Sequence, residues 1–340
     1  MNLKIESNIN LSDFSTFKIG GSADFFTKVK DQSELSFALD WAGKNKKKVF
    51  VLGGGSKTIF SDQGFSGLVI KNEMRGIKVM SENEDSSIVR VFSGETWSRF
   101  INFSIENNLY GLENTFYIPG TVGAAPIQNI GAYGAEMKDC FHNLMAINIE
   151  TREKKYFNLQ DCEFSYRDSI FKGKLKNKYF IVWVDFRLKK KADLKLNYPD
   201  IQKALNDKNI PNPSLKELTE IIREIRDSKL PNPAVLPNSG SFFKNPIISL
   251  DSFDELKERF PEIKSFPDNN GVKIPAGWLI EQCGFKGRQF GQVGVYEKQA
   301  LIIVNHGGAK QSDVVSLVEN IKMEVKNKFG IILEEEVNVL

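Results

Sequence analysis

The sequence is poor in the residues that build metal centres and disulfide frameworks. Its 340 residues include two histidines and three cysteines, and the cysteines are widely spaced, with no Cys-x-x-Cys pair. A zinc site needs a cluster of such ligands, and a disulfide framework needs an even set of cysteines. We therefore expect neither a bound metal nor a disulfide framework.

Long apolar runs are also missing. The longest, such as residues 180–184 and 300–304, have five residues, whereas a bilayer span needs about 20. The opening residues lack the apolar region and the cleavage site of a secretory signal. The expected location is the cytoplasm, without a membrane partner.

The chain has no excess of charge of one sign. Lys and Arg number 46 and Asp and Glu number 43, which leaves a net charge of +3. Nucleic-acid binding usually needs a strongly basic field, so a nucleic-acid partner is not expected. With 41% apolar residues, the chain resembles an ordinary globular protein, and its length allows about two or three domains.

The common nucleotide signatures are absent as well. No Gly-x-Gly-x-x-Gly occurs. Lys57 and Thr58 suggest a P-loop at first sight, but Ser56 and Val51 stand where that motif needs glycine. Kinase and ordinary Rossmann interpretations are therefore not supported.

What is present instead is a different use of glycine. Gly-Gly-Gly-Ser at 53–56 follows an apolar run, and residues 119–134 hold a nearly uncharged, glycine-rich block, PGTVGAAPIQNIGAYG. Bare backbone N–H groups in such loops can bind a diphosphate without Lys or Arg. The two loops suit a dinucleotide, although the short run could also be a set of turn glycines.

The apolar pattern predicts helices and strands along the whole chain. Asp31 and Glu34 resemble a capping box before a helix, which leads to a buried strand at 49–52. A strand at 89–92 precedes a helix with Trp97, Ile101, Ile105 and Leu109 on one face. Residues 144–190 read as an antiparallel sheet and 189–213 as a linker.

The C-terminal half has its own pattern. A helix with Leu218, Ile221, Ile222 and Ile225 on one face follows the linker. Ser312 is expected to cap a further helix that ends at Gly330, and residues 331–340 read as a strand.

The 119–134 block, with Gly-Leu-Glu at 111–113 before it, resembles the flavin-binding signature of the UDP-N-acetylenolpyruvoylglucosamine reductase family. Four further segments match that family in order: TFKIGG at 16–21, YRDSIFK at 166–172, GSFFKNP at 240–246 and LEEEV at 333–337. Together these segments span nearly the whole chain.

The resemblance implies an α+β fold. A two-part FAD-binding region of the vanillyl-alcohol-oxidase type would comprise residues 1–70, with 331–340 returning to it, and 71–205. A smaller α+β substrate domain would comprise 206–330.

The implied activity is that of a monomeric flavoenzyme of peptidoglycan precursor synthesis. With non-covalent FAD and NADPH, it would reduce the enolpyruvyl ether of a UDP-sugar to UDP-N-acetylmuramate. A hydride would add to C3 and a proton to C2.

Three catalytic residues follow from the same resemblance. Arg167 would stabilise the negative charge of the enolate, although an arginine next to Asp168 could also form a surface ion pair. Ser241 would donate the proton to C2; by itself it reads as a turn residue. Glu336 would assist at C2, and only the family register selects it over Glu334, which strand alternation puts on the same face.

The resemblance also implies contacts with the cofactor and the substrate. The substrate loop would supply Tyr198, in the subtype of the family that has this tyrosine, and Lys57 replaces the asparagine common at its position. The expected cofactor-binding residues are Gly53, Gly54, Gly55, Ser56, Pro119, Gly120, Gly123, Ala124, Gln128, Asn129 and Gly131. The expected substrate-binding residues are Tyr166, Tyr198, Lys229, Asn245 and Gln282.

Two alternatives compete with the reductase. One is an FAD-dependent sugar or hydroxy-acid oxidase, but such enzymes often tether the flavin through His or Cys, and neither occurs before position 137. The other is a flavin-binding protein without turnover, which would have no need for Arg167, Ser241 and Glu336 together.

Overall fold

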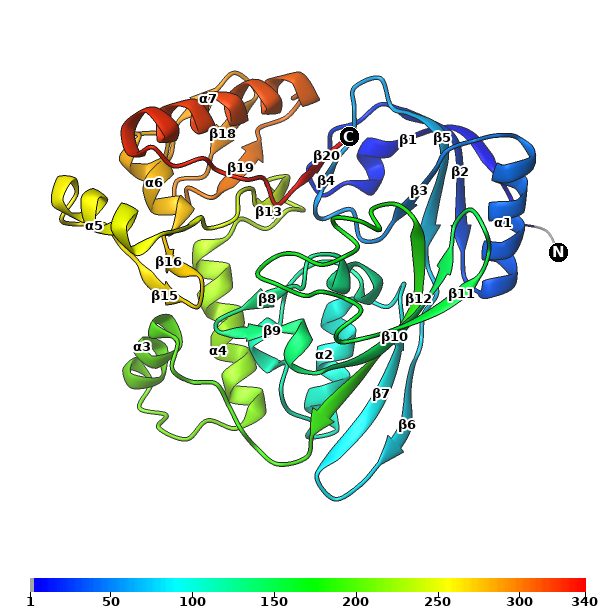
Figure 1. Cartoon of the computed structure of the whole chain (residues 1–340), viewed down its shortest axis with the longest axis horizontal. Coiled ribbons are helices and arrows are strands. Elements are labelled where there is room, and N and C mark those ends of the chain that lie inside the picture. The colour runs from blue at the N-terminus through cyan, green and yellow to red at the C-terminus, as the bar shows by residue number, and fades with distance from the viewer. Residues whose placement is uncertain (1–2) are drawn as a thin grey trace. The chain divides into compact units, whose positions relative to one another are not determined.

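The structure is a computed structural model that describes residues 3–340 (Figure 1). Contacts divide the chain into two compact units, and each combines helices with sheets, which confirms the α+β class. Unit 1 contains the described residues up to Ile9, Ala23–Gly54 and Phe65–Ser228. Unit 2 contains Asn10–Ser22, Gly55–Gly64 and Lys229–Leu340.

The predicted helix that follows Asp31 packs against the first sheet of unit 1. Its strand order is β1-β2-β5-β3, and β2 and β3 both run parallel to β5. Asp31 caps α1 (Gln32–Lys44) by accepting from the N–H groups of Ser33 and Glu34. Leu35 and the following apolar positions are buried as predicted. The strands are β1 (Glu6–Asn10), β2 (Ser22–Val29), β3 (Val49–Leu52) and β5 (Phe65–Asn72).

The second sheet of unit 1 is antiparallel, as the sequence predicts. Its order is β11-β10-β12-β7-β6, and α2 (Trp97–Glu106) follows β7. Leu109 is buried but lies beyond this helix, because Asn108 has a positive φ of 51° and ends it. The strands are β6 (Ile77–Glu82), β7 (Ser86–Phe92), β10 (Phe141–Asn148), β11 (Lys154–Asn158) and β12 (Tyr179–Lys189).

Only short elements occupy the glycine-rich region and its surroundings. They are the 3₁₀ turns η2 (Glu113–Thr115), η3 (Val122–Ile127) and η4 (Met137–Asp139), and the two-residue strands β8 (Gly131–Ala132) and β9 (Ala135–Glu136). A further 3₁₀ turn, η1 (Leu11–Phe14), follows β1 and belongs to unit 2.

The predicted linker at 189–213 contains a helix, α3 (Pro199–Asp207), which corrects the sequence interpretation. Pro199 occupies the first helical turn, where proline is tolerated. Ile201 and Leu205, four residues apart, are buried against α4 (Leu215–Lys229). The Lys-, Asn- and Pro-rich composition hid this short apolar face.

Unit 2 contains an antiparallel sheet in the order β13-β19-β18-β17. A smaller sheet has the order β14-β16-β15. The strands are β13 (Asn238–Ser241), β14 (Ile247–Ile248), β15 (Phe266–Asp268), β16 (Gly271–Lys273), β17 (Gln289–Phe290), β18 (Val293–Val295) and β19 (Ile302–Asn305). The helices are α5 (Leu250–Arg259), α6 (Ala276–Gln282) and α7 (Gln311–Phe329).

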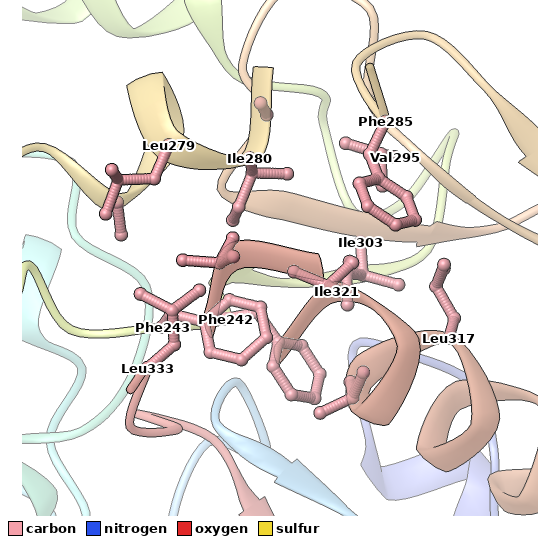
Figure 2. Packing of buried hydrophobic residues seen from close by; sticks show 14 of the residues in the cluster. Phe242, Phe243, Leu279, Ile280, Phe285, Val295, Ile303, Leu317, Ile321 and Leu333 are labelled. Atoms are coloured by element: carbon pink, nitrogen blue, oxygen red, sulfur yellow. The ribbon is translucent and has the colours of Figure 1, made fainter. Parts of the chain in front are cut away.

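Apolar side chains from these elements form one core, part of which is drawn in Figure 2. Phe242 and Phe243, which follow β13, pack there with Ile280 of α6 and Ile321 of α7. The residue after Ser241 is therefore fixed in the interior of unit 2.

The first turn of α7 differs from the sequence prediction. Ser312 lies inside the helix, and Asp62 accepts from the N–H groups of Gln311 at 2.7 Å and of Ser312 at 3.4 Å. A carboxylate distant in sequence thus satisfies the exposed helix donors. The other end is as predicted, because Gly330 closes the helix with a φ of 73°.

The C-terminal segment is mostly not a strand, contrary to the prediction for 331–340. Only β20 (Asn338–Val339) is regular, and it pairs in parallel with β4 (Thr58–Ile59), as Figure 1 shows. Glu335 forms an isolated bridge to Phe243. The N–H group of Glu336 donates to the carbonyl of Phe242 at 2.7 Å, so the segment follows the end of β13.

The predicted three-domain division stays a prediction. Unit 1 includes residues 206–228, because the apolar face of α4 packs against α3. Unit 2 includes residues 10–22 and 55–64 from the N-terminal part of the chain.

The described residues show neither a membrane-spanning helix nor a metal-binding cluster. Among residues 3–340, no helix has both the length and the apolar character of a membrane span. The same residues contain no group of three or more His, Cys, Asp or Glu that could hold a metal ion. The three cysteines are free thiols.

Removal of Arg90 is expected to destabilise unit 1. Its Nε and Nη2 donate to the two carboxylate oxygens of Asp185 at 2.8 and 2.9 Å, and the Asp185 side chain is only 5% exposed. Arg90→Met leaves this buried carboxylate without its cation, so the free energy of unfolding should fall by about 3–5 kcal/mol. Urea denaturation followed by circular dichroism measures the loss.

Lys191→Met is the matched control. Lys191 pairs with Asp85 at 2.7 Å, but both side chains are more than 70% exposed, and such pairs contribute little to stability. Equal losses in the two variants would contradict the role assigned to the Arg90 pair.

Candidate active site

Two glycine segments of unit 1 meet backbone to backbone. A Cβ built on Gly54 would lie 2.9 Å from the Cα of Gly120, and one built on Gly53 would lie 2.6 Å from Oγ1 of Thr121. Only glycine permits this approach. The two loops that the sequence singled out are therefore neighbours, and main chain packs against main chain where Gly54 meets Gly120.

Residues of the longer loop differ in what they offer to a ligand. The N–H group of Gly123 donates to the carbonyl of Ser93 at 2.8 Å, and that of Ala124 donates to the carbonyl of Thr121 at 3.0 Å. These two N–H groups hold the loop in shape. Thr121 is different, because its buried Oγ1 has no hydrogen-bond partner among residues 3–340.

Asn129, an expected cofactor contact, uses its side chain within the protein. Its Nδ2 donates to Glu136 at 3.1 Å and to the carbonyl of Ser165 at 3.0 Å, and its Oδ1 accepts from the N–H group of Lys138 at 3.0 Å. The fully buried amide thus joins the glycine-rich block to the segment that carries Arg167.

Arg167 lies beside the glycine-rich block. Its Nη2 donates to the carbonyl of Gly131 at 2.5 Å, and its guanidinium carbon lies 5.3 Å from the ring centroid of Tyr166. Its φ of 54° is uncommon for a residue with a side chain. Reciprocal main-chain hydrogen bonds between Ser165 and Asp168, at 3.2 and 3.3 Å, hold this tight turn.

Tyr198 belongs to an aromatic cluster in unit 1. It precedes the first residue of α3, and its ring centroid lies 5.1 Å from that of Tyr133 in an edge arrangement. Burial raises the pKa of Tyr133 to about 12 and also raises the pKa of Tyr198, so both hydroxyls are protonated at neutral pH.

Sequence reasoning missed Tyr133 and also Arg226, which contacts it. Arg226 forms a side-chain hydrogen bond with Tyr133, and burial lowers the pKa of its guanidinium. Its buried Nε has no hydrogen-bond partner among the described residues. The sequence feature that could have indicated a buried Arg226 is its position four residues after Ile222, at the edge of the apolar face of α4.

Unit 2 brings together the other two expected catalytic residues. Ser241 ends β13, and Glu336 is buried with 7% of its surface exposed. Between them lies Lys57, whose Nζ is 3.0 Å from Oε1 of Glu336 and donates to the carbonyl of Ser241 at 2.5 Å. Burial also separates the two glutamates that the sequence left ambiguous, because the Glu334 side chain is 70% exposed.

The remaining expected substrate residues lie at helix ends. Asn245 accepts through Oδ1 from the N–H group of Ala276, at the start of α6, at 2.9 Å. Gln282 is exposed at the other end of α6, where its carbonyl accepts from Lys328 of α7 at 2.5 Å. Lys229 ends α4. Their contact with substrate stays a prediction.

Both halves of the chain match known protein families. Residues 23–151 match the FAD binding domain model, and residues 232–340 match the C-terminal domain of UDP-N-acetylenolpyruvoylglucosamine reductase. The chain is 43% identical to that reductase from Flavobacterium johnsoniae, over 99% of this chain and all of the relative. It belongs to the UDP-N-acetylenolpyruvoylglucosamine reductase family.

Other members of the family agree over the full length. The reductase of Pseudomonas syringae pv. syringae is 42% identical, with all of both chains covered. The solved reductase structure from Thermus caldophilus superposes with a TM-score of 0.70 over 99% of each chain, at 21% identity. That likeness supports the same fold.

The residues of unit 1 fit the FAD that this family binds. The contact of Gly54 with Gly120 gives a diphosphate close access to main chain. The unpartnered Thr121 Oγ1 offers a hydroxyl at the same place. FAD is therefore the cofactor of this chain, and the contacts of the individual loop residues with it stay predictions, as does the approach of Arg167 to Ser241 and Glu336.

Gly54→Ala is expected to reduce FAD binding. Its new Cβ would meet the main chain of Gly120, so the two loops must separate. The flavin-to-protein ratio of the purified variant, read from its visible spectrum, should fall at least about threefold, because a weaker affinity lowers the fraction of protein that retains FAD.

Gly173→Ala provides the control. The nearest atom to its Cβ, the carbonyl oxygen of Ser169, is 4.0 Å away, so nothing need move. A Gly54→Ala protein with the flavin content of Gly173→Ala would show that the loop contact does not support the cofactor.

Proposed function

We propose that the chain is an NADPH- and FAD-dependent reductase that converts UDP-N-acetylenolpyruvoylglucosamine to UDP-N-acetylmuramate in peptidoglycan precursor synthesis. The observation that carries the proposal is the match to reductase relatives over the whole length of both chains. It includes both the FAD binding domain and the C-terminal domain.

Side chains of this protein stabilise the negative charge that forms at C2 and supply the proton that C2 takes up. Bound FAD supplies the hydride chemistry between NADPH and C3 of the enolpyruvyl group. Hydride addition at C3 leaves negative charge on C2 and its carboxylate. The Arg167 guanidinium, with its permanent charge and planar set of donors, stabilises that charge.

Protonation at C2 is assigned to unit 2. Ser241 provides the hydroxyl proton, and Glu336 assists from the neighbouring segment. A serine hydroxyl is a weak acid, so it needs a preorganised polar surrounding. The ion pair of Lys57 with Glu336, next to the Ser241 carbonyl, is such a surrounding.

Substrate contacts complete the proposal. Tyr198 covers the substrate, and Tyr166, Asn245 and Gln282 hydrogen-bond its polar groups. Lys229 forms an ion pair with the phosphate of the substrate.

The proposal extends to the organisation of the molecule. The proposed enzyme is a cytoplasmic monomer, in which one chain supplies the three expected catalytic side chains. Its FAD-binding region comprises residues 1–70 with 331–340 and residues 71–205, and its substrate domain comprises 206–330.

The visible spectrum tests the activity directly. The purified protein should be yellow, lose its colour when NADPH is added without oxygen, and regain it when UDP-N-acetylenolpyruvoylglucosamine follows. If oxygen reoxidises the reduced flavin and the UDP-sugar does not, the result would instead favour an oxidase.

Ser241→Ala is expected to separate the two half-reactions. NADPH should still bleach the flavin, while reoxidation by the UDP-sugar should slow at least about 100-fold, as for loss of a general acid. Anaerobic stopped-flow absorbance measures both rates. Ser239→Ala, two residues earlier and buried, should reoxidise at the wild-type rate, and a wild-type rate in Ser241→Ala would exclude its role as proton donor.

A further inference from the structure

Three consecutive glutamates near the C-terminus each pair with a different lysine. Glu334 pairs with Lys244 at 2.7 Å and Glu335 with Lys322 at 3.0 Å. Glu336 pairs with Lys57 at 3.0 Å. The exposed fractions of the three carboxylate side chains are 70%, 31% and 9%, in that order. Only the last pair is largely removed from water.

The ammonium of Lys57 has a second partner in the same place. It donates to the main-chain carbonyl of Ser241 at 2.5 Å. Gly240 is also close, because a Cβ built on it would lie 3.7 Å from Nζ. One cation thus contacts the Glu336 side chain and the main chain that carries the Ser241 hydroxyl.

The main chain fixes Lys57 from both sides. Before it, Gly55 adopts a φ of 68° and lies so close to Phe14 that a Cβ would overlap the Phe14 carbonyl oxygen. After it, the Lys57 carbonyl accepts from the N–H group of Asn338 at 2.8 Å, where β20 pairs with β4. The direction of the side chain therefore follows from the fold of unit 2.

We propose that Lys57 is a positioning residue for protonation at C2, an inference that rests on the proposed function. Its ammonium holds the Glu336 carboxylate in one orientation through their ion pair. It also fixes the main chain at Ser241. The Glu336 carboxylate acts as a hydrogen-bond acceptor, and the proton for C2 comes from Ser241.

The competing explanation is that Lys57 only anchors the C-terminal segment. An anchor would support flavin binding and both half-reactions alike. A positioning residue affects only the half-reaction in which Ser241 and Glu336 act. The two half-reactions of the FAD-loaded enzyme therefore distinguish these roles.

The experiment compares Lys57→Met with the wild type by anaerobic stopped-flow absorbance. Reduction by NADPH should stay within about twofold, whereas reoxidation by UDP-N-acetylenolpyruvoylglucosamine should slow at least about tenfold. Lys57→Arg, which keeps the charge, should recover most of the reoxidation rate.

Lys322→Met is the matched control. Lys322 also lies 3.0 Å from a glutamate of the same segment, and its side chain is 27% exposed, against 25% for Lys57. The Lys322→Met enzyme should match the wild type in the rates of both half-reactions.

A double-mutant cycle tests whether Lys57 acts through Glu336. In a Glu336→Gln background, Lys57→Met should slow reoxidation at least about threefold less than it does in the wild-type background, because the carboxylate it positions is gone and only its bond to the Ser241 carbonyl remains. Independent, multiplicative effects of the two substitutions would overturn the proposal.

The remaining outcomes are also decisive. A wild-type reoxidation rate in Lys57→Met, or equal losses in both half-reactions, would overturn the positioning role. If Lys57→Met fails to fold or to bind FAD, Lys57→Gln is judged by the same criteria, and its failure too would assign Lys57 to the anchor role. Failure of the wild type itself to reoxidise with the UDP-sugar would refute the proposed function instead.

Discussion

A carboxylate stays in a protein interior only beside a compensating charge, and in unit 2 that charge is the ammonium of Lys57. The two residues come from segments near opposite ends of the chain. Their contact depends on the pairing of β20 with β4 and on the main-chain bond between Glu336 and Phe242. The geometry around Ser241 therefore depends on how these segments are held together.

In unit 1, the close contact between two loops depends on glycines, which have no side chain. Gly53 and Gly54 lie against Thr121 and Gly120 at distances that no Cβ tolerates. The loops offer a ligand main-chain groups, and the hydrogen bonds of Asn129 and Arg167 brace the block around them. Polar side chains thus shape the site, while glycine gives access to it.

Elements governed by local sequence were predictable. The Asp31 cap and the apolar face that begins at Leu35 specify α1, and Ile221 and Ile222 mark the buried face of α4. The class of fold, the family and the cofactor followed from several motifs in order, as the full-length relatives confirm.

Features that depend on distant contacts were not predictable. Asp62 replaces the expected Ser312 cap of α7 from far away in the sequence. The C-terminal segment is irregular because it follows the end of β13 instead of a full-length strand. The partner of Lys57 is another such case, since nothing near position 57 indicates Glu336.

The composition of unit 2 also bears on how the chain folds during synthesis. Phe17, Ile19 and Ile59 belong to the same core as Phe242 and Leu333. All residues of unit 1 have been translated by Ser228, whereas this core also needs Leu333, which is translated much later. The early segments 10–22 and 55–64 are therefore synthesised long before their apolar partners, and a nascent chain halted before Leu333 exposes surface that chaperones recognise.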